Sequence, residues 1–416
     1  MNRKVKVFAR TLVAFVWLFL AESCVKETVV EELEDNEGVI VPTVSEEAAM
    51  IQVGTNKPFK TIKEAAEAAG NNTIIAIDAG TYKGDVAEWT QDSLVIRAVG
   101  GEVILDADGK YVDGMGIWKI NGGTVYVEGI TFRNAKVPDG NGAGIRLVNG
   151  QLTVVGCRFL HNQMGILTSN FSSVSLTVRN SEFGYGGNGD GLSHNIYVGQ
   201  NSRVDISGCW FHHGNIGHLI KSRAAISFIY CNLIADGNDA NSLASYEIDI
   251  PSGGQAVIVG NIIQQSATTD NPHFISFAKE ERNRYEQNRI FIAHNTFLNS
   301  HNGSDDYVLG APTSGVEIYM LNNVIQDNAK FNASIPMDVE KGTVFYKPNE
   351  LTADYLPASM VVENWKSKLE KDIDTYLPPE LKDSALWLTP THQYLAPMST
   401  KKLTATPSLP GAVQLP

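Results

Sequence analysis

Short runs of alternating apolar and polar residues recur along the chain. Each run is followed, a few residues later, by a Phe or Ile anchor, and successive anchors lie 23 to 34 residues apart. The anchors are Phe132, Phe159, Phe183, Phe211, Ile234, Ile263, Phe297 and Ile325. A period of this length, built from short strands, is typical of a solenoid whose repeats stack on one another. The pattern therefore predicts an all-β fold, a single-stranded right-handed parallel β-helix with three short strands in each coil.

Two further columns of residues follow the same period. The first is a set of isoleucines that we expect to point inward from a second strand of each coil: Ile145, Ile166, Ile196, Ile220, Ile248 and Ile275. The second lies two residues before the anchors and holds Cys157, Ser181, Cys209, Asn232, Asn261, Asn295 and Asn323. Stacked Asn side chains can satisfy backbone groups at a turn. We expect the two cysteines of that column to be small structural substitutes.

Both ends of such a fold need a cover, because an exposed strand edge pairs with other chains. The segment from Phe59 to Ala66 predicts an amphipathic helix with Thr61 as its N-cap, and a strand is expected from Thr73 to Ile77. We expect this helix to cap the N-terminal end. A Pro-rich tail from about Val339, with a helix near 362–371, is expected to form an irregular C-terminal cap.

The first 50 residues have the features of an export signal. Basic residues precede an apolar run from Thr11 to Ala21, which is too short to be a first choice for a membrane span. The run ends in a sequence that resembles a bacterial lipobox, with Cys24 as the lipidated residue. An acidic stretch with few aromatic residues follows and predicts a solvated tether. Its place directly after the cysteine resembles the surface-export signal of Bacteroidota lipoproteins.

These features predict three segments. Residues 1–23 are expected to be a lipoprotein signal peptide, 24–50 an acidic tether, and 51–416 one β-helix domain that includes the C-terminal cap. We expect a cell-surface lipoprotein of the outer membrane that contacts the membrane through its lipid alone. Periplasmic location or ordinary secretion is the alternative.

The net charge and the composition limit the classes of molecule that we expect this protein to bind. The formal net charge of −13 argues against nucleic acid as a partner, since proteins that bind phosphate backbones are normally basic. It leaves room for a local basic groove that binds an acidic sugar. With 43% hydrophobic residues the chain can form a large core, and we expect a monomer.

Three successive coils carry a dense polar set on the strand of inward isoleucines. Strand alternation turns the residues beside each isoleucine outward. One outward column is then Tyr197, Lys221 and Asp249, and the neighbouring one is Asn195, Leu219 and Glu247. Around them lie Arg223, His194, His218, Tyr246 and His273, whereas the charge run at 279–284 is expected to be a solvated loop. Three coils span about 10 Å, the length of two sugar rings.

Two chemistries fit this set. The first is β-elimination from a uronic-acid polymer, in which Lys221 acts as the base if its surroundings favour the neutral amine. Arg223 would hold the substrate carboxylate in a fork, and Tyr197, His194 or His218 would assist as acid or base. Asn195, Tyr246, Glu247, Asp249 and His273 are the candidates for substrate binding.

The second chemistry is glycoside hydrolysis by Glu247 and Asp249. Two residues apart on one strand, their backbones would lie about 6.5–7 Å apart, which suits an inverting paired-carboxylate mechanism. A C5-epimerase or a glycan-binding β-helix without activity is also compatible with the same residues.

Several motifs resemble those of the β-helix polysaccharide lyases of the pectate-lyase-like superfamily, in particular the chondroitinase B and alginate lyase group. They are the coil period, the Gly80-Thr81-Tyr82 opening, the Asn column and the strand Ile220-Lys221-Ser222. The resemblance implies a lyase with Lys221 as its base. That group has an arginine about one coil after the lysine, whereas this chain has Glu247 and Asp249 there and Arg223 as a substitute.

The same resemblance implies that Glu247 and Asp249 could hold a Ca²⁺ ion, as in the pectate-lyase-like relatives, because hard oxygen ligands suit that ion. A β-helix on a surface lipoprotein also resembles gut Bacteroidota lyases of glycosaminoglycans. It therefore implies chondroitin sulfate, dermatan sulfate or hyaluronan as the substrate.

Overall fold

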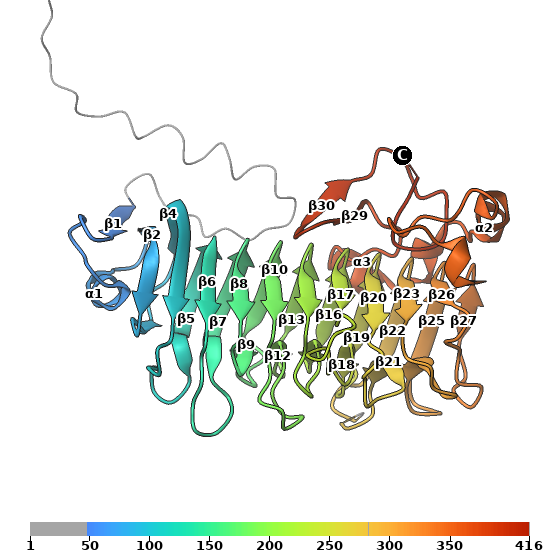
Figure 1. The fold of residues 1–416 in the computed structure, drawn as a ribbon, viewed down its shortest axis with the longest axis horizontal. Coiled ribbons are helices and arrows are strands. Elements are labelled where there is room, and N and C mark those ends of the chain that lie inside the picture. Colours follow the sequence, from blue (N-terminus) through green and yellow to red (C-terminus); the bar gives the residue numbers. More distant parts are fainter. Residues whose placement is uncertain (1–47, 282, 416) are drawn as a thin grey trace, which may run out of the picture. The chain divides into compact units, whose positions relative to one another are not determined.

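The computed structural model describes residues 48–281 and 283–415, and these form a parallel β-solenoid of about ten turns with a pectate-lyase-like fold (Figure 1). The predicted right-handed parallel β-helix is confirmed. The expected signal peptide, Cys24 and nearly all of the expected tether lie outside the described residues. No described helix is long and apolar enough to cross a membrane.

Each coil adds one strand to each of three parallel sheets. The first, named the patch sheet here, contains β3 (Ala87–Trp89), β9 (Met164–Thr168), β12 (Ile196–Val198), β15 (Ile220–Ser222), β18 (Ile248–Ile250), β21 (His273–Phe277) and β24 (Tyr307–Gly310). The second sheet contains β1 (Ala49–Val53), β10 (Ser175–Arg179), β13 (Arg203–Ser207), β16 (Ile226–Tyr230), β19 (Gln255–Val259), β22 (Arg289–Ala293), β25 (Glu317–Leu321) and β27 (Val339–Lys341).

The third sheet contains β6 (Ile130–Arg133), β8 (Arg158–Leu160), β11 (Glu182–Gly184), β14 (Trp210–His212), β17 (Leu233–Ala235), β20 (Ile262–Gln265), β23 (Thr296–Asn299), β26 (Val324–Gln326) and β28 (Val344–Tyr346). Four longer strands run from one sheet into the next: β2 (Thr73–Lys83), β4 (Leu94–Asp106), β5 (Gly116–Glu128) and β7 (Ala143–Val155).

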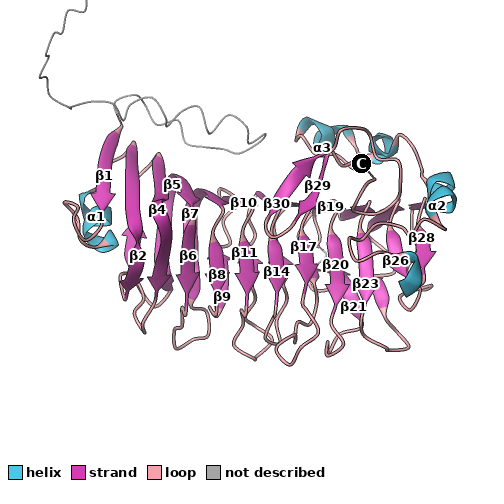
Figure 2. Cartoon of the chain, turned by 45° about the horizontal axis from the view of Figure 1, so that its top comes forward, coloured by secondary structure: helices cyan, strands magenta, loops and turns pink. Residues whose placement is uncertain are grey.

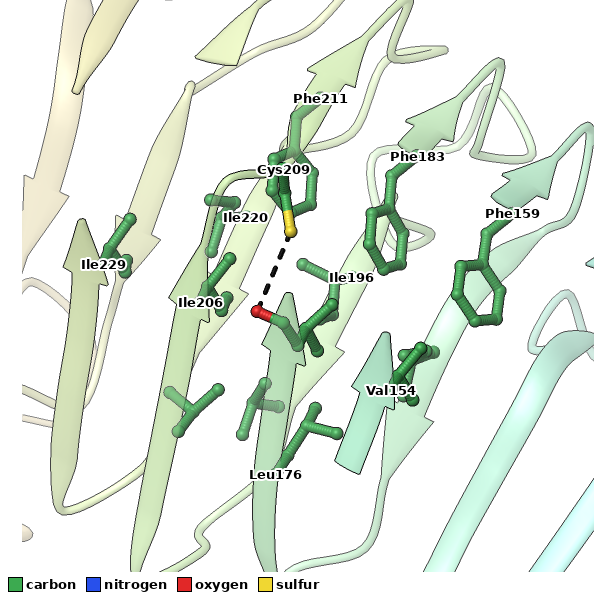
Figure 3. Close-up of a cluster of buried hydrophobic side chains, with 14 of the residues drawn as sticks. Val154, Phe159, Leu176, Phe183, Ile196, Ile206, Cys209, Phe211, Ile220 and Ile229 are labelled. Atoms are coloured by element: carbon green, nitrogen blue, oxygen red, sulfur yellow. Dashed lines mark hydrogen bonds between the residues drawn. The ribbon is translucent and has the colours of Figure 1, made fainter. Parts of the chain in front are cut away.

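The strand register confirms the predicted inward column of isoleucines, and the Phe anchors form a second inward column. Ile145, Ile166, Ile196, Ile220, Ile248 and Ile275 are successive partners, and all of them are buried. Phe159, Phe183 and Phe211 lie in a row inside the coils (Figure 3), with ring centres 4.7 and 4.8 Å apart. Each such buried side chain contributes roughly 1.5–3 kcal/mol, which makes the interior the main source of stability.

The predicted column of Asn side chains is also present. The backbone N–H of Asn232 donates to Oδ1 of Asn261 at 3.0 Å, and its Nδ2 donates to the same atom at 2.9 Å. Asn261 repeats both bonds to Asn295, and Asn295 repeats them to Asn323. Cys209 occupies an equivalent place as a buried free thiol, and its N–H donates to Asn232 Oδ1 at 2.9 Å. The ladder thus satisfies buried turn amides from coil to coil.

The N-terminal helix forms as predicted. Helix α1 (Ile62–Ala68) begins at a capping box, in which Thr61 Oγ1 accepts from the N–H of Glu64 at 3.1 Å. Glu64 Oε2 accepts in return from the N–H of Thr61 at 3.2 Å. Ile62 and Ala65 are buried in the main core cluster, so this helix covers the first coils.

The C-terminal region begins later than predicted. Strands β27 and β28 pair with the coil before them, so the last coil runs through Tyr346 and not to about residue 339. The remaining elements are η2 (Pro348–Glu350), α2 (Val362–Lys368), η3 (Ile373–Tyr376), α3 (Pro379–Asp383), β29 (His392–Leu395) and β30 (Ser399–Lys402). Helix α2 confirms the helix expected near this position.

This tail covers the sides of the coils and does more than close their end (Figure 2). Leu381 and Leu388 share a buried cluster with Phe228, Val257 and Phe291, which point outward from the second sheet. A smaller cluster on the third sheet packs Tyr394 and Ala412 against Ile262. Apolar residues on an outer face need a cover, which explains the departure from a simple end cap. No strand of the patch sheet takes part in these tail clusters among the described residues.

Candidate functional site

The outward column predicted for the patch sheet is confirmed. Tyr197 pairs in register with Lys221, Lys221 with Asp249, and Asp249 with Ser276. Around this column we define the polar patch as Tyr197, His218, Lys221, Arg223, Asp249 and Glu280, together with the stacked His194. The patch lies on the sheet that the tail leaves uncovered. Tyr197, Arg223 and Glu280 are accessible there, whereas Lys221 and Asp249 are buried.

Lys221 lies at the centre of the polar patch. Its Nζ is 3.2 Å from Oδ2 of Asp249 and 3.8 Å from Oε1 of Glu280, and it lies 5.6 Å from the centre of the Tyr197 ring. Asp249 is almost completely buried, and this burial raises the pKa of its carboxyl although Lys221 opposes the shift. The lysine and the aspartate therefore form a buried ion pair on the outer side of the sheet.

Arg223 follows strand β15 and connects the patch to two loops. Its Nε donates to the Tyr197 hydroxyl oxygen at 3.0 Å, and its Nη1 donates to Oγ of Ser252 at 3.1 Å. Nη2 forms an ion pair with Glu280. Burial alone would lower the pKa of Arg223, but the hydrogen bonds to Glu280 and Tyr197 raise it. Arg223 is thus a fixed positive charge next to the phenol of Tyr197.

The two predicted histidines, His194 and His218, stack with ring centres 4.7 Å apart. The N–H of His218 donates to Nδ1 of His194 at 3.0 Å, and the N–H of Tyr246 donates to Nδ1 of His218 at 3.3 Å. Each neutral ring therefore carries its proton on Nε2. Burial lowers the pKa of His194 well below its usual value and, with help from the charge of Lys221, lowers the pKa of His218 to about 3. At neutral pH both rings are uncharged hydrogen-bond donors at Nε2.

These histidines begin a longer row of rings at the entrance to the strands. The ring centres of His218 and Tyr246 are 5.0 Å apart, those of Tyr246 and His273 6.5 Å, and those of His273 and Tyr307 5.5 Å. Tyr246, His273 and Tyr307 are partly exposed. Tyr246 and His273 were predicted to lie here, and Tyr307 could have been found by extending the same offset one coil further. The row offers flat aromatic faces beside the polar patch.

Asn195 and Leu219 are not outward, contrary to the prediction. Both precede strands of three residues and are buried at a corner of the coil. Leu219 belongs to the main core cluster. The amide of Asn195 donates to the carbonyl oxygens of Phe183 at 3.2 Å and His212 at 3.0 Å. Strand alternation does not extend past the end of a strand, so the expected second outward column does not exist.

Glu247 lies at the same kind of corner and is fully buried. Neither of its carboxylate oxygens has a hydrogen-bond partner among the described residues. Burial raises the pKa of Glu247 well above its usual value, and the charge of the buried Asp236 adds to the shift, so the neutral acid is favoured. The predicted role of Glu247 in substrate binding and its pairing with Asp249 for hydrolysis are therefore wrong.

The same burial bears on the expected Ca²⁺ site. Glu247 is enclosed in the interior, while Oδ2 of Asp249 faces Lys221 and lies 3.4 Å from Nε2 of His218. Within residues 48–281 and 283–415 there is no group of three or more His, Cys, Asp and Glu side chains that could hold a metal ion. Glu247 and Asp249 do not fit a shared Ca²⁺ ion.

One hollow in the described residues lies away from the patch, and another lies at its edge. One of about 540 Å³ lies beside β3 and is lined by Glu67, Glu88 and Asp113 among other residues. A second of about 380 Å³ lies at the loop that carries Glu280 and Glu281. The acidic lining of the first hollow suits an anionic ligand less well than the patch, where Lys221 and Arg223 lie.

No family model matches the sequence, and no curated protein matches it. Among solved structures, the pectate lyase Pel9A is similar over 88% of this chain and 97% of its own, with a TM-score of 0.51 and 14% identity. An alginate lyase from Paenibacillus sp. str. FPU-7 covers 71% of this chain and 99% of its own, with a TM-score of 0.48 and 17% identity.

A pectin methylesterase in complex with a hexasaccharide is more distant, with a TM-score of 0.31 and 13% identity over 79% of this chain and 98% of its own. At such identities the similarity shows the fold. The chain therefore has the pectate-lyase-like β-helix that the resemblance predicted, and its structural neighbours include polysaccharide lyases and pectin methylesterases.

Proposed function

We propose that this protein binds a uronic-acid-containing polysaccharide across the patch sheet and cleaves it by β-elimination. One observation carries the proposal: the carboxylate of Glu280 lies between Nζ of Lys221, at 3.8 Å, and the guanidinium of Arg223. Glu280 is on a loop, and its side chain is 50% exposed. A uronate carboxylate has the same charge and shape, so it can replace Glu280 on the two cations.

The residues around that position supply the anion-binding group, the base and the acid that an elimination needs. Arg223 binds the substrate carboxylate and neutralises its charge, which makes the proton at C5 easier to remove. Lys221 takes this proton after passing its own to Asp249, whose pKa is raised by burial. The electron pair forms the C4–C5 double bond, the bond from C4 to O4 breaks, and the hydroxyl of Tyr197 gives its proton to O4.

Binding without cleavage is the second candidate function. It is favoured by the ion pair of Lys221 with Asp249 at 3.2 Å, since an amine that stays charged binds an anion but takes no proton. A C5-epimerase would need the same proton transfer and would leave the chain uncut. The burial of Glu247 removes the support for an inverting hydrolase.

For the substrate, we propose a glycosaminoglycan first, with chondroitin sulfate, dermatan sulfate or hyaluronan as the candidates. The structural neighbours include a pectate lyase and an alginate lyase, so polygalacturonate and alginate are the alternatives. We further propose that the protein acts as a monomer at the cell surface, held in the outer membrane through lipidated Cys24.

The test is the ultraviolet absorbance of the unsaturated uronate product. Purified protein of residues 25–416 is incubated with chondroitin sulfate, hyaluronan, alginate and polygalacturonate, each with and without a chelator. A rise on any polymer supports a lyase and gives its substrate class. New reducing ends without absorbance would contradict elimination, and retained binding without either product would leave the binding function.

A further inference from the structure

The outward column of the polar patch continues toward the N-terminus and reaches another cation. Strand pairing places Arg146 on β7 opposite Leu167 on β9, and Leu167 opposite Tyr197 on β12. Tyr197 is in turn the register partner of Lys221. Arg146 therefore lies three coils from Lys221 on the same outer face, at about 14 Å for a coil spacing of about 4.8 Å.

Arg146 lacks the partners that its neighbours have. It is partly buried, its Nε has no hydrogen-bond partner, and no described carboxylate lies within 4.0 Å of it, although Asp139 lies near enough to influence its charge. Lys119, one coil further along the column, is instead held by Glu88 at 2.9 Å and Asp113 at 2.6 Å. A cation that is partly removed from water and has no carboxylate in contact with it is costly, so an anionic ligand gains by binding to it.

The outward column between the two cations carries no charged residue, only Leu167 and Tyr197. Leu167, Met164 and Ala143 form a small cluster with Tyr197 packed against it. This cluster occupies the interval between Arg146 at one end and Lys221 with Arg223 at the other. The outer face thus has two positive positions separated by a strip that consists of Leu167, which is 5% exposed, and the partly exposed Tyr197. This spacing matches a chain of sugar rings that carries anionic groups at intervals.

We propose that Arg146 forms a second anion subsite, which binds a carboxylate or sulfate of the same polysaccharide while the intervening sugars lie on the strip from Leu167 to Tyr197. The inference rests on the proposed polysaccharide binding but not on cleavage. It predicts that affinity increases once the chain is long enough to reach from Lys221 to Arg146.

The test compares two arginine variants for direct binding. Arg146→Met and the control Arg97→Met are made in a Lys221→Ala background, so that the polymer stays intact, and calorimetry measures binding to hyaluronan and chondroitin sulfate. Arg97 is a matched control because it is also partly buried with an unpartnered Nε, but it lies on β4 in the second sheet. We expect Arg146→Met to weaken binding at least about tenfold and Arg97→Met to leave it unchanged.

Loss on hyaluronan as well as on chondroitin sulfate would identify a carboxylate as the bound group, and loss on chondroitin sulfate alone a sulfate; both support the subsite. Equal binding by Arg146→Met and its parent, or equal losses in both arginine variants, would overturn it. Thermal melting checks folding, and Arg146→Lys, which keeps the charge, should retain most of the affinity. If binding depends on Arg146 while the ultraviolet assay stays flat, the lyase proposal fails and the subsite stands.

Discussion

The second sheet and the patch sheet are built from the same coils and bury equivalent inward columns, yet their outer faces differ. On the second sheet the outward residues Phe228, Val257 and Phe291 are apolar, and the C-terminal tail buries them. On the patch sheet the outward residues of the same region are polar, as in Lys221 and Asp249, and they take no part in the tail clusters. In both Figure 1 and Figure 2 the tail lies on the side away from β9 and β21.

The difference shows which positions of a coil are free to carry chemistry. Inward columns must stack on themselves in every coil, so their residue types are constrained by packing. Outward columns have no such requirement. One sheet uses them to fix the tail and the other to present charged groups, so function is expected on the face where outward residues are neither apolar nor covered.

Among the variants that test the difference between the two sheets, Lys221→Ala is expected to have the largest effect, which is on the rate of elimination. Loss of a proton-transferring group should slow elimination by about 10²- to 10⁴-fold, measured as the rate of ultraviolet absorbance increase. Lys119→Ala is the matched control, since Lys119 lies in the same outward column but is paired with Glu88 and Asp113. A Lys221→Ala variant with full elimination activity would remove the proposed base.

A substitution on the covered outer face of the second sheet should lower stability and leave polysaccharide binding unchanged. Phe291→Ala removes a fully buried ring beneath the tail, stacked 4.5 Å from Tyr319, and should cost about 3–5 kcal/mol of unfolding free energy in a denaturant titration. Polysaccharide binding below the melting transition should not change. Phe345→Ala is the control, because Phe345 is 47% exposed and its loss should cost far less. Equal destabilisation by the two variants would mean that packing of the Phe291 ring beneath the tail adds no stability of its own.

A third prediction concerns Glu247, which is buried in the interior two residues before Asp249 of the polar patch. The pKa of Glu247 is raised in the folded protein, so its ionisation works against folding once the pH exceeds the unfolded value of about 4.5. Glu247→Gln should therefore stabilise the protein at pH 7 and give little or no gain at pH 4, as measured by thermal melting at both values. A gain of equal size at the two pH values would show that the effect is not due to ionisation.

The smallest effect is expected for the loop carboxylate. Glu280→Gln removes the negative group that lies on Lys221 and Arg223, so binding of an anionic polymer should become about two- to fivefold tighter in calorimetry. Glu317→Gln is the control, since Glu317 pairs with Arg289 at 3.0 Å on the second sheet and has a similar exposure of 44%. Weaker binding by Glu280→Gln would show that this residue holds the ligand and does not compete with it.

The coil repeat was predictable because stacked inward positions must keep one period and one residue type. Ile196, Ile220 and Ile248 therefore stand out in the amino-acid sequence itself, and they fix the outward register of Tyr197, Lys221 and Asp249. The fold and the centre of the polar patch follow from that register.

The residues that were misplaced lie outside the strands. Glu247 was predicted by alternation, which holds only along a strand, and β18 begins one residue later. Glu280 was expected in a solvated loop, because the sequence does not show that this loop folds back onto Arg223, 57 residues away. The position of the tail also depends on contacts between distant segments, such as Arg203 with the carbonyl of Ser384, which no local pattern reveals.

The path of the tail also has a mechanical consequence. In a simple solenoid each coil contacts only its neighbours, so unfolding can start at an end and proceed coil by coil. Here the carbonyl oxygens of His392 and Glu370 accept from Cys231 and Asn322, which are coils apart, and Ala412 donates to Thr296. The tail is thus bonded to several coils of the C-terminal half, so we expect those coils to unfold together in one cooperative step. The first coils, which lack these bonds, can fray by themselves.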